Sequence, residues 1–173
     1  TIIGVNDAPS ALPQSIVVPE QEKVVVGLSG SDPDGDVPNI FKISSLPSHG
    51  ELYDGGLLIT ESNHSLLGVL SYQHISENTV EDSFRFVAND GLLDSVAAAT
   101  VSISISAEND PPEIIGSLSA SVVEGQEHVL TFTHLGYSDV DDSDTGVTYT
   151  VSNLTHGKIQ VNSVDTLTFS GAD

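Results

Sequence analysis

The sequence repeats itself at the scale of a whole domain. Four landmarks recur in the same order, at offsets of 103 to 107 residues: Asn6-Asp7 at Asn109-Asp110, Gln21-Glu22 at Gln126-Glu127, Ser31-Asp32 at Ser138-Asp139, and His49-Gly50 at His156-Gly157. A repeat of this length can enclose its own hydrophobic core, whereas solenoid units are much shorter. The sequence therefore predicts tandem domains, each of which folds on its own.

The repeat divides the chain into four expected segments. We expect the last strand of a preceding module plus a linker at 1–9, a complete module at 10–107, a linker at 108–113, and a partial second module at 114–173 that lacks its C-terminal strands. A partial sandwich leaves strand edges unpaired, so this module is expected to be less stable or to borrow a strand. Residues 1–5 of another copy are a candidate donor by strand addition.

Alternation of apolar and polar residues predicts an all-β fold. The segments 83–87 and 100–106 alternate strictly, and 51–59 has the pattern of a hairpin around Asp54-Gly55-Gly56. Short strands with turn residues every ten or so positions are typical of a tandem antiparallel β-sandwich, cadherin-like or Ig-like, with Greek-key connections. We expect this core: Val24, Val26, Leu28, Phe41, Ile43, Leu52, Leu58, Tyr72, Phe84, Phe86, Val101, Ile103 and Ile105.

The charge is strongly negative, which excludes several classes of function. Asp and Glu number 25 against 4 Lys and Arg, for a net charge of −21. Such a field repels nucleic acid and anionic membrane surfaces. The sequence contains no Cys and no apolar run long enough to insert into a membrane. The carboxylates either keep the surface solvated or bind divalent cations.

The positions of the carboxylates favour a cation. Asp32, Asp34 and Asp36 alternate in a turn-forming segment, and Asp139 and Asp141 recur at the matching place in the second unit. Calcium takes six to eight oxygen ligands in loose geometry, and alternate residues of a tight loop can supply them. Because clustered like charges oppose folding unless a cation offsets them, we predict Ca²⁺ as the cofactor. The segment lacks the glycine and the glutamate that an EF-hand loop requires.

The ordered motifs resemble a known group of repeats. Asn-Asp-x-Pro at the module boundary, Ser-Asp-x-Asp, Pro-Ser-His-Gly-Glu-Leu, and Asn89-Asp90-Gly91 together resemble the cadherin-like tandem repeats of large bacterial surface proteins, including repeats-in-toxin adhesins and chondroitin-sulfate-proteoglycan-type repeats. The resemblance implies calcium ions at the junctions between modules. It departs from the cadherin pattern at Ala107 and Pro111, so fewer ions per junction, or a site internal to each module, stay open.

The resemblance also implies which residues bind the metal. For the junction inside this chain the expected ligands are Glu20, Asp82 (or Glu81), Glu108, Asn109, Asp110, Asp139 and Asp141. For the upstream junction they are Asn6, Asp7, Asp32 and Asp34. An internal site would instead use Asp36, Asp90 and Asp94.

The sequence thus predicts an extracellular or cell-surface adhesin module that acts as a spacer stiffened by calcium. The expected partners are neighbouring repeats, other copies through homophilic contact or strand exchange, and a carbohydrate or host surface ligand. The runner-up is a carbohydrate-binding module in which Tyr53, Tyr72 and Tyr137 line a shallow site, and a further alternative is an acidic spacer without metal. No nucleophile elbow or phosphate-binding loop is present, so we expect no enzyme activity.

Overall fold

The computed structural model describes residues 5–35, 37–76, 79–141 and 147–170, so the predicted donor strand lies almost wholly outside the described residues. In these ranges the chain consists of strands, turns and irregular segments, with no helix long and apolar enough to cross a membrane. The chain divides into two compact units, residues 1–108 and 109–173. The predicted domain boundaries stay a prediction.

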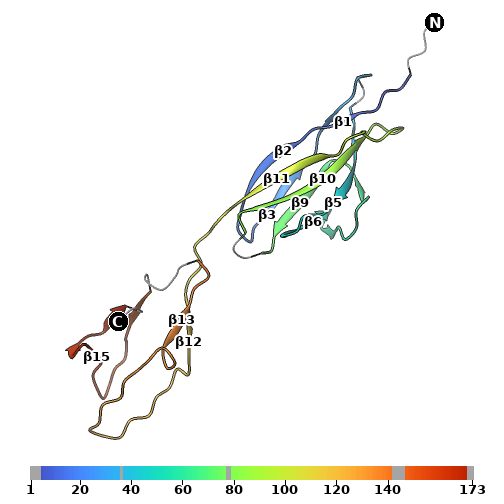
Figure 1. Ribbon diagram of the computed structural model, residues 1–173. Helices are drawn as coiled ribbons and strands as arrows, with labels where there is room; N and C mark the ends of the chain where they lie inside the picture. The colour runs from blue at the N-terminus through green and yellow to red at the C-terminus, as the bar shows by residue number, and fades with distance from the viewer. Residues whose placement is uncertain (1–4, 36, 77–78, 142–146, 171–173) are drawn as a thin grey trace. The chain divides into compact units, whose positions relative to one another are not determined.

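Unit 1 is a sandwich of two sheets (Figure 1). Its strands are β1 (Ser10–Ala11), β2 (Gln14–Pro19), β3 (Lys23–Gly27), β4 (Gly30–Ser31), β5 (Ile40–Ser45), β6 (Gly50–Asp54), β7 (Leu57–Leu58), β8 (Ser65–Leu66), β9 (Val69–His74), β10 (Glu81–Asn89) and β11 (Ala99–Ser106). One sheet has the order β2-β11-β10-β5-β8 and the other the order β3-β9-β6-β7, while β1 pairs with β4. The all-β sandwich predicted from the alternation is confirmed.

Alternating side chains from both sheets form one core. Phe84 and Phe86 of β10 and Val101 of β11 point inward and meet Leu52 and Tyr72 from the opposite sheet. All five are essentially inaccessible to water. Burial of each such side chain stabilises the fold by roughly 1.5–3 kcal/mol relative to exposure, before the entropy cost of ordering is subtracted.

One pairing departs from the expected antiparallel pattern, because β2 runs parallel to β11 from Gln14 to Pro19. The preceding strand β1 belongs with β4, and Leu12 N still donates to Ser29 O at 3.0 Å. Pro13 has no N–H to continue that ladder. The chain therefore leaves β4 here and joins the five-stranded sheet at its edge, next to β11.

The predicted core is wrong at Leu58 and incomplete elsewhere. Leu58 is 46 % exposed, whereas its neighbour Ile59 is only 4 % exposed. The cause is the hairpin turn, which is formed by Gly55 and Gly56 alone, with φ angles of 56° and 90°. Tyr53 then lies opposite Leu58, and residues directly opposite share a face, so both point outward. Val24 is only partly buried, and buried residues absent from the prediction include Val18, Leu66, Leu70, Ala88 and Ala99.

Unit 2 contains short strand pairs that repeat two pieces of unit 1. Its strands are β12 (Glu113–Ile115), β13 (Gly136–Ser138), β14 (Thr148–Thr150), β15 (Gln160–Val161), β16 (Val164–Asp165) and β17 (Thr168–Ser170), paired β12-β13, β14-β17 and β15-β16. The β15–β16 hairpin turns through Asn162 and Ser163, both with positive φ, as β6–β7 turns through its two glycines. The pair β12–β13 corresponds to β1–β4. Tyr137 is buried, but most described apolar side chains of unit 2 are exposed.

Candidate functional site

At the N-terminal end of unit 1, carboxylates hold the backbone of the preceding linker. Asp7 N donates to Asp34 Oδ2 at 2.7 Å, and Asp34 N donates to Asp32 Oδ1 at 2.8 Å. Asn6 Nδ2 donates to the carbonyl of Asp7 at 3.1 Å. Gly35, with φ of 90°, closes the turn by donating from its N–H to Asp32 O at 3.3 Å. The Asp-Pro-Asp turn is thus bonded to the Asn-Asp linker 27 residues earlier.

Unit 2 has the same three hydrogen bonds. Asp110 N donates to Asp141 Oδ2 at 2.6 Å, Asp141 N donates to Asp139 Oδ1 at 3.0 Å, and Asn109 Nδ2 donates to Asp110 O at 3.0 Å. We call each arrangement a carboxylate latch, formed by Asn6, Asp7, Asp32 and Asp34 in unit 1 and by Asn109, Asp110, Asp139 and Asp141 in unit 2. Sequence reasoning grouped these residues but missed the direct bond between linker backbone and turn carboxylate. In the sequence, the only sign of this hydrogen bond is that the Asn-Asp motif and the Ser-Asp-x-Asp motif recur in the same order in both units.

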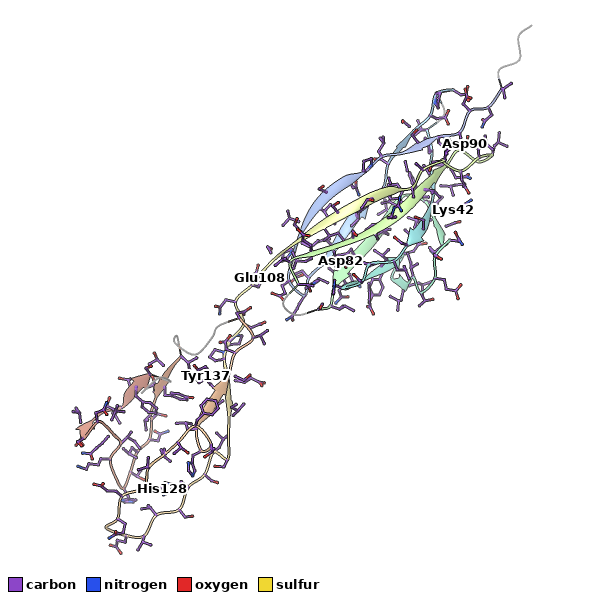
Figure 2. All side chains as sticks on the ribbon, viewed as in Figure 1. Lys42, Asp82, Asp90, Glu108, His128 and Tyr137 are labelled. Atoms are coloured by element: carbon purple, nitrogen blue, oxygen red, sulfur yellow. The ribbon has the colours of Figure 1, made fainter. Side chains whose placement is uncertain are left out.

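Asp90 joins the latch of unit 1 through Asn6, whose Nδ2 donates to Asp90 Oδ2 at 2.9 Å. The other oxygen of Asp90 accepts from the N–H groups of Leu92 and Leu93, at 2.7 Å each. These donors, Leu93 first, then Asn6 and Leu92, hold the pKa of Asp90 below its usual value. Asp90 lies at the end of unit 1 next to the N-terminal segment (Figure 2).

One oxygen of the latch is buried without a hydrogen-bond partner in the described part of the chain: Asp32 Oδ2. Leaving a buried polar atom unsatisfied costs about 1–3 kcal/mol, and more when the group is charged. A cation bound there would remove that cost, so the donor chemistry fits Ca²⁺. Even so, no three acidic or histidine side chains among the described residues gather closely enough to hold an ion. Asp36, the third predicted carboxylate of this turn, lies outside the described residues.

The negative charge of Asp94 is already balanced by the side chain of Lys42. Lys42 Nζ donates to both carboxylate oxygens, at 2.6 and 2.7 Å, and Asn89 Nδ2 donates to Oδ1 at 2.6 Å. The hydrogen bond from Lys42, followed by that from Asn89, lowers the pKa of Asp94. An internal metal site that includes Asp94 would have to displace Lys42.

At the opposite end of unit 1 the carboxylate of Asp82 is occupied by protein donors (Figure 2). Oδ1 accepts from Ser48 N at 3.0 Å and Ser83 N at 2.8 Å, and Oδ2 accepts from His49 N at 3.0 Å and Tyr72 OH at 2.9 Å. Burial, and then this bond to Asp82, raise the pKa of Tyr72 far above its ordinary value. The Ser-His-Gly landmark is therefore the turn that Asp82 fixes onto β10.

The other two ligands predicted for this end differ in exposure. Glu20 is buried and its N–H donates to Ser106 O at 2.9 Å, whereas Glu108 is exposed.

Two of the three tyrosines expected in a carbohydrate site are buried. Tyr72 has no exposed surface, and Tyr137 lies under the ring edges of Phe132 and Tyr149. Tyr53 is on the surface, but Lys23 Nζ lies 3.4 Å from its ring centroid. A sugar ring that stacks on an aromatic side chain needs that face free, so the surface of unit 1 does not favour the stacking type of site.

Two facing sheets of mainly antiparallel strands define an immunoglobulin-like sandwich. Residues 6–104 match the family described as Bacterial Ig domain, and the chain belongs to that family. The narrower resemblance to cadherin-like repeats stays a prediction.

The chain is similar to short segments of two long proteins. Integrin beta-like protein A of Dictyostelium discoideum is 35 % identical over 127 residues, which cover 70 % of this chain and 6 % of that protein. Extracellular matrix protein 3 of Lytechinus variegatus is 26 % identical over 163 residues, covering 87 % of this chain and 5 % of that protein. The chain thus spans a small fraction of either relative.

Solved structures with similar folds include the titin domains Z1Z2 in complex with telethonin, with a TM-score of 0.33 and 18 % identity over 65 % of this chain and 54 % of that one. Domains 4–9 of the surface layer protein SbsC match with a TM-score of 0.33 and 10 % identity over 93 % of this chain and 26 % of that one. Similarity at this level carries no functional information.

Proposed function

We propose that this chain is part of an extracellular adhesion protein, in which it acts as a spacer whose linkers are stiffened by Ca²⁺ at the carboxylate latches. The observation that carries the proposal is the recurrence of the same latch in both units, with the same atoms as donors and acceptors. The similar proteins named for integrin-like and extracellular matrix roles support an extracellular setting. The proposed partners are neighbouring repeats, other copies of the chain, and a host or carbohydrate surface.

The metal would use residues that the latches already bring together. In unit 1 these are Asn6, Asp7, Asp32 and Asp34, with Asp90 bonded to Asn6. In unit 2 they are Asn109, Asp110, Asp139 and Asp141. Calcium prefers several charged oxygens, so the carboxylates of Asp32 and Asp34 would have to turn toward a common point.

Repulsion between carboxylates is the energy that a bound calcium ion would offset. With 25 acidic and 4 basic side chains, the negative charges of the protein repel one another. The repulsion is strongest between neighbouring carboxylates in the same turn. A bound divalent ion offsets this repulsion locally and ties the linker to the turn. At a hundredfold excess over Kd, one ion would stabilise the folded state by about 2.7 kcal/mol. Extracellular sites of this kind bind at roughly 10⁻⁴ to 10⁻³ M, so at about 1 mM calcium one ion would stabilise the folded state by about 0.4–1.4 kcal/mol.

The test compares thermal unfolding in chelator and in millimolar calcium. Asp32→Asn and Asp34→Asn keep an oxygen for the latch hydrogen bonds but remove the charge that a cation needs. We expect calcium to raise the Tm of the wild-type protein and of the matched surface control Glu61→Gln, and to raise it much less in the two latch variants. Equal melting of the wild type with and without calcium, together with no heat of binding in calorimetry, would overturn the calcium role and leave an acidic spacer.

A further inference from the structure

Two asparagines of the chain are followed, two residues later, by a serine or a threonine, with a residue other than proline between. The two motifs are Asn-His-Ser at 63–65 and Asn-Leu-Thr at 153–155. The pattern Asn-x-Ser/Thr is the acceptor motif for N-linked oligosaccharide. A motif of three residues is common by chance, so the surroundings of each asparagine decide whether a glycan fits there.

Both motifs lie in turns, and both asparagines are exposed. Asn63 comes just before β8 and has a φ of 69°, and Asn153 lies between β14 and β15 with a φ of 59°. Asparagine adopts this left-handed conformation more readily than most residues, and it does so mainly in turns. The hydroxyl-bearing residues of the motifs, Ser65 and Thr155, are exposed as well. A sugar on either asparagine would therefore extend into solvent and displace no core side chain.

The side-chain amides of the two motifs are not used to hold the fold. Asn6, Asn89 and Asn109 donate from Nδ2 to a carboxylate or a carbonyl, and none of the three has a hydroxyl residue two positions later. The side chains of Asn63 and Asn153, in contrast, make no hydrogen bond to the described part of the protein. Their Nδ2 atoms are thus available for a covalent bond.

The turn at Asn63 is held by other groups. Asn63 N donates to Ile43 O at 2.6 Å, and Ile43 N donates to His64 O at 3.0 Å. The side chain of His64 is bonded to Asp54, with 2.9 Å between Nε2 and Oδ2. Because the Asn63 side chain takes no part in these contacts, a glycan or a glutamine at this position leaves the turn intact.

We infer that Asn63 and Asn153 are acceptor sites for N-linked oligosaccharide, one in each unit. The sugar donor is an oligosaccharide carried on a polyprenyl diphosphate in the secretory pathway. In the transfer the bond between C1 of the first sugar and the diphosphate breaks, C1 forms a bond to Nδ2, and Nδ2 loses one proton, so that polyprenyl diphosphate is the leaving group. The inference rests on the extracellular setting of the proposed function and makes no use of calcium.

The glycan on Asn63 covers an open edge of the sandwich. Strand β8 is the last strand of the five-stranded sheet, and Leu67, which follows it, is 81 % exposed. Uncovered edge strands pair with other chains unless charge, proline or a covering group prevents it. N-linked glycans are bulky and solubilising, and this one is attached two residues before β8 begins.

The experiment is secretion of the 173-residue chain from a eukaryotic cell line, followed by intact-mass spectrometry before and after treatment with peptide-N-glycosidase. The wild type is expected to carry two glycans that the enzyme removes. Asn63→Gln and Ser65→Ala should each abolish the first glycan, and Asn153→Gln the second. Ser65→Thr keeps the hydroxyl and should keep the glycan.

The matched controls are Asn39→Gln and Asn162→Gln, two exposed asparagines that lack a hydroxyl residue two positions later. Both variants should retain two glycans. Thermal unfolding of Ser65→Ala made without glycans in bacteria should match that of the wild type made in the same way, which shows that its glycan is not lost through misfolding.

Secreted wild type with the mass of the unmodified chain overturns the inference, as does a glycan on Asn63 that persists in Ser65→Ala. The covering role is tested by comparing Asn63→Gln with Asn153→Gln, since each carries one glycan. Asn63→Gln should aggregate at a lower protein concentration, and equal aggregation would refute the covering of β8. Neither measurement involves calcium, so a missing glycan leaves the latch proposal standing, and calcium-independent melting leaves the glycan result unaffected.

Discussion

Replacing Asp82 by alanine tests whether this carboxylate supports the fold or binds metal. Its two oxygens accept five hydrogen bonds, from the backbone of Ser48, His49 and Ser83 and from the hydroxyls of Ser48 and Tyr72. Tyr72 is completely buried, and its hydroxyl loses this partner when the carboxylate is removed. Asp82 therefore connects the turn before β6 to the centre of the core.

The expected cost follows from these partners. A buried hydroxyl left without a partner costs about 1–3 kcal/mol. The Ser48 and His49 N–H groups lie nearer the surface, and each lost bond to them costs about 0.5–1 kcal/mol after rehydration. We expect Asp82→Ala to lower the free energy of unfolding of unit 1 by about 3 kcal/mol, a large part of the stability of a small domain.

The assay is denaturant unfolding in chelator, with a double-mutant cycle that adds Tyr72→Phe. Phenylalanine fills the same space without a hydroxyl, so in the Asp82→Ala background it should cost almost nothing and can even stabilise. The coupling free energy between the two positions should be about 1–2 kcal/mol. Glu61→Ala serves as the surface control. Additive effects would refute the reasoning, and a destabilisation that appears only when calcium is present would show that Asp82 is a ligand.

Three further predictions concern the turns and one ion pair. Gly50→Ala should destabilise unit 1 by about 1–3 kcal/mol, since a Cβ at this position overlaps the Tyr72 ring; Gly27→Ala, where a Cβ meets open space, is the control in the same unfolding assay. Asp94 has a lowered pKa in the folded state, so its stabilising contribution is present above the unfolded value of about 3.9 and is lost as the pH falls through the folded pKa. Lys42→Met should therefore reduce the acid sensitivity of unfolding, by only a few tenths of a kcal/mol because the Asp94 side chain is 45 % exposed; equal acid sensitivity in both proteins would contradict this. Ser163→Gly should stabilise the β15–β16 hairpin by up to about 1 kcal/mol, because serine has a φ of 68° there, while Gly56→Ser should destabilise the corresponding turn in unit 1; hydrogen exchange of the flanking amides measures both.

The sequence predicted the parts of the fold that depend on local alternation. Strand β11 alternates apolar and polar residues over its length, β10 does so from Ser83 to Phe86, and their inward side chains are buried as expected. Leu58 and Ile59 could not be assigned in this way, because a one-residue difference in the turn reverses which side chain points inward. The turn consists of the two glycines Gly55 and Gly56 rather than of three residues. The alternation of apolar and polar residues does not indicate this turn length.

For the candidate site, the sequence identified the residue types but not their partners. Asp32 and Asp34 were predicted as ligands from their spacing; in the structure Asp34 accepts from the linker backbone, and Asp32 accepts from the N–H of Asp34. Asp82 was predicted from resemblance alone, and two of its donor residues, Ser48 and His49, lie in a turn 34 and 33 residues earlier in the chain. Long-range hydrogen bonds of this kind depend on the packing of two sheets, which a single sequence does not reveal.

Comparison of the two units shows which features form without a closed hydrophobic core and which require one. Unit 2 repeats the carboxylate latch and the hairpin of unit 1, although Val129 and Phe132 remain exposed in it. The hairpin is held by backbone hydrogen bonds between β15 and β16, and the latch by backbone N–H groups that donate to the carboxylates of Asp139 and Asp141. The core of unit 1, in contrast, requires inward side chains from β9, β10 and β11 at once. The latch therefore does not depend on a closed sandwich. It follows that a substitution that unfolds the core of unit 1, such as Phe84→Ala, should leave the latch of unit 2 intact, and slow exchange of the Asp110 and Asp141 amides in that variant is the measurement that decides.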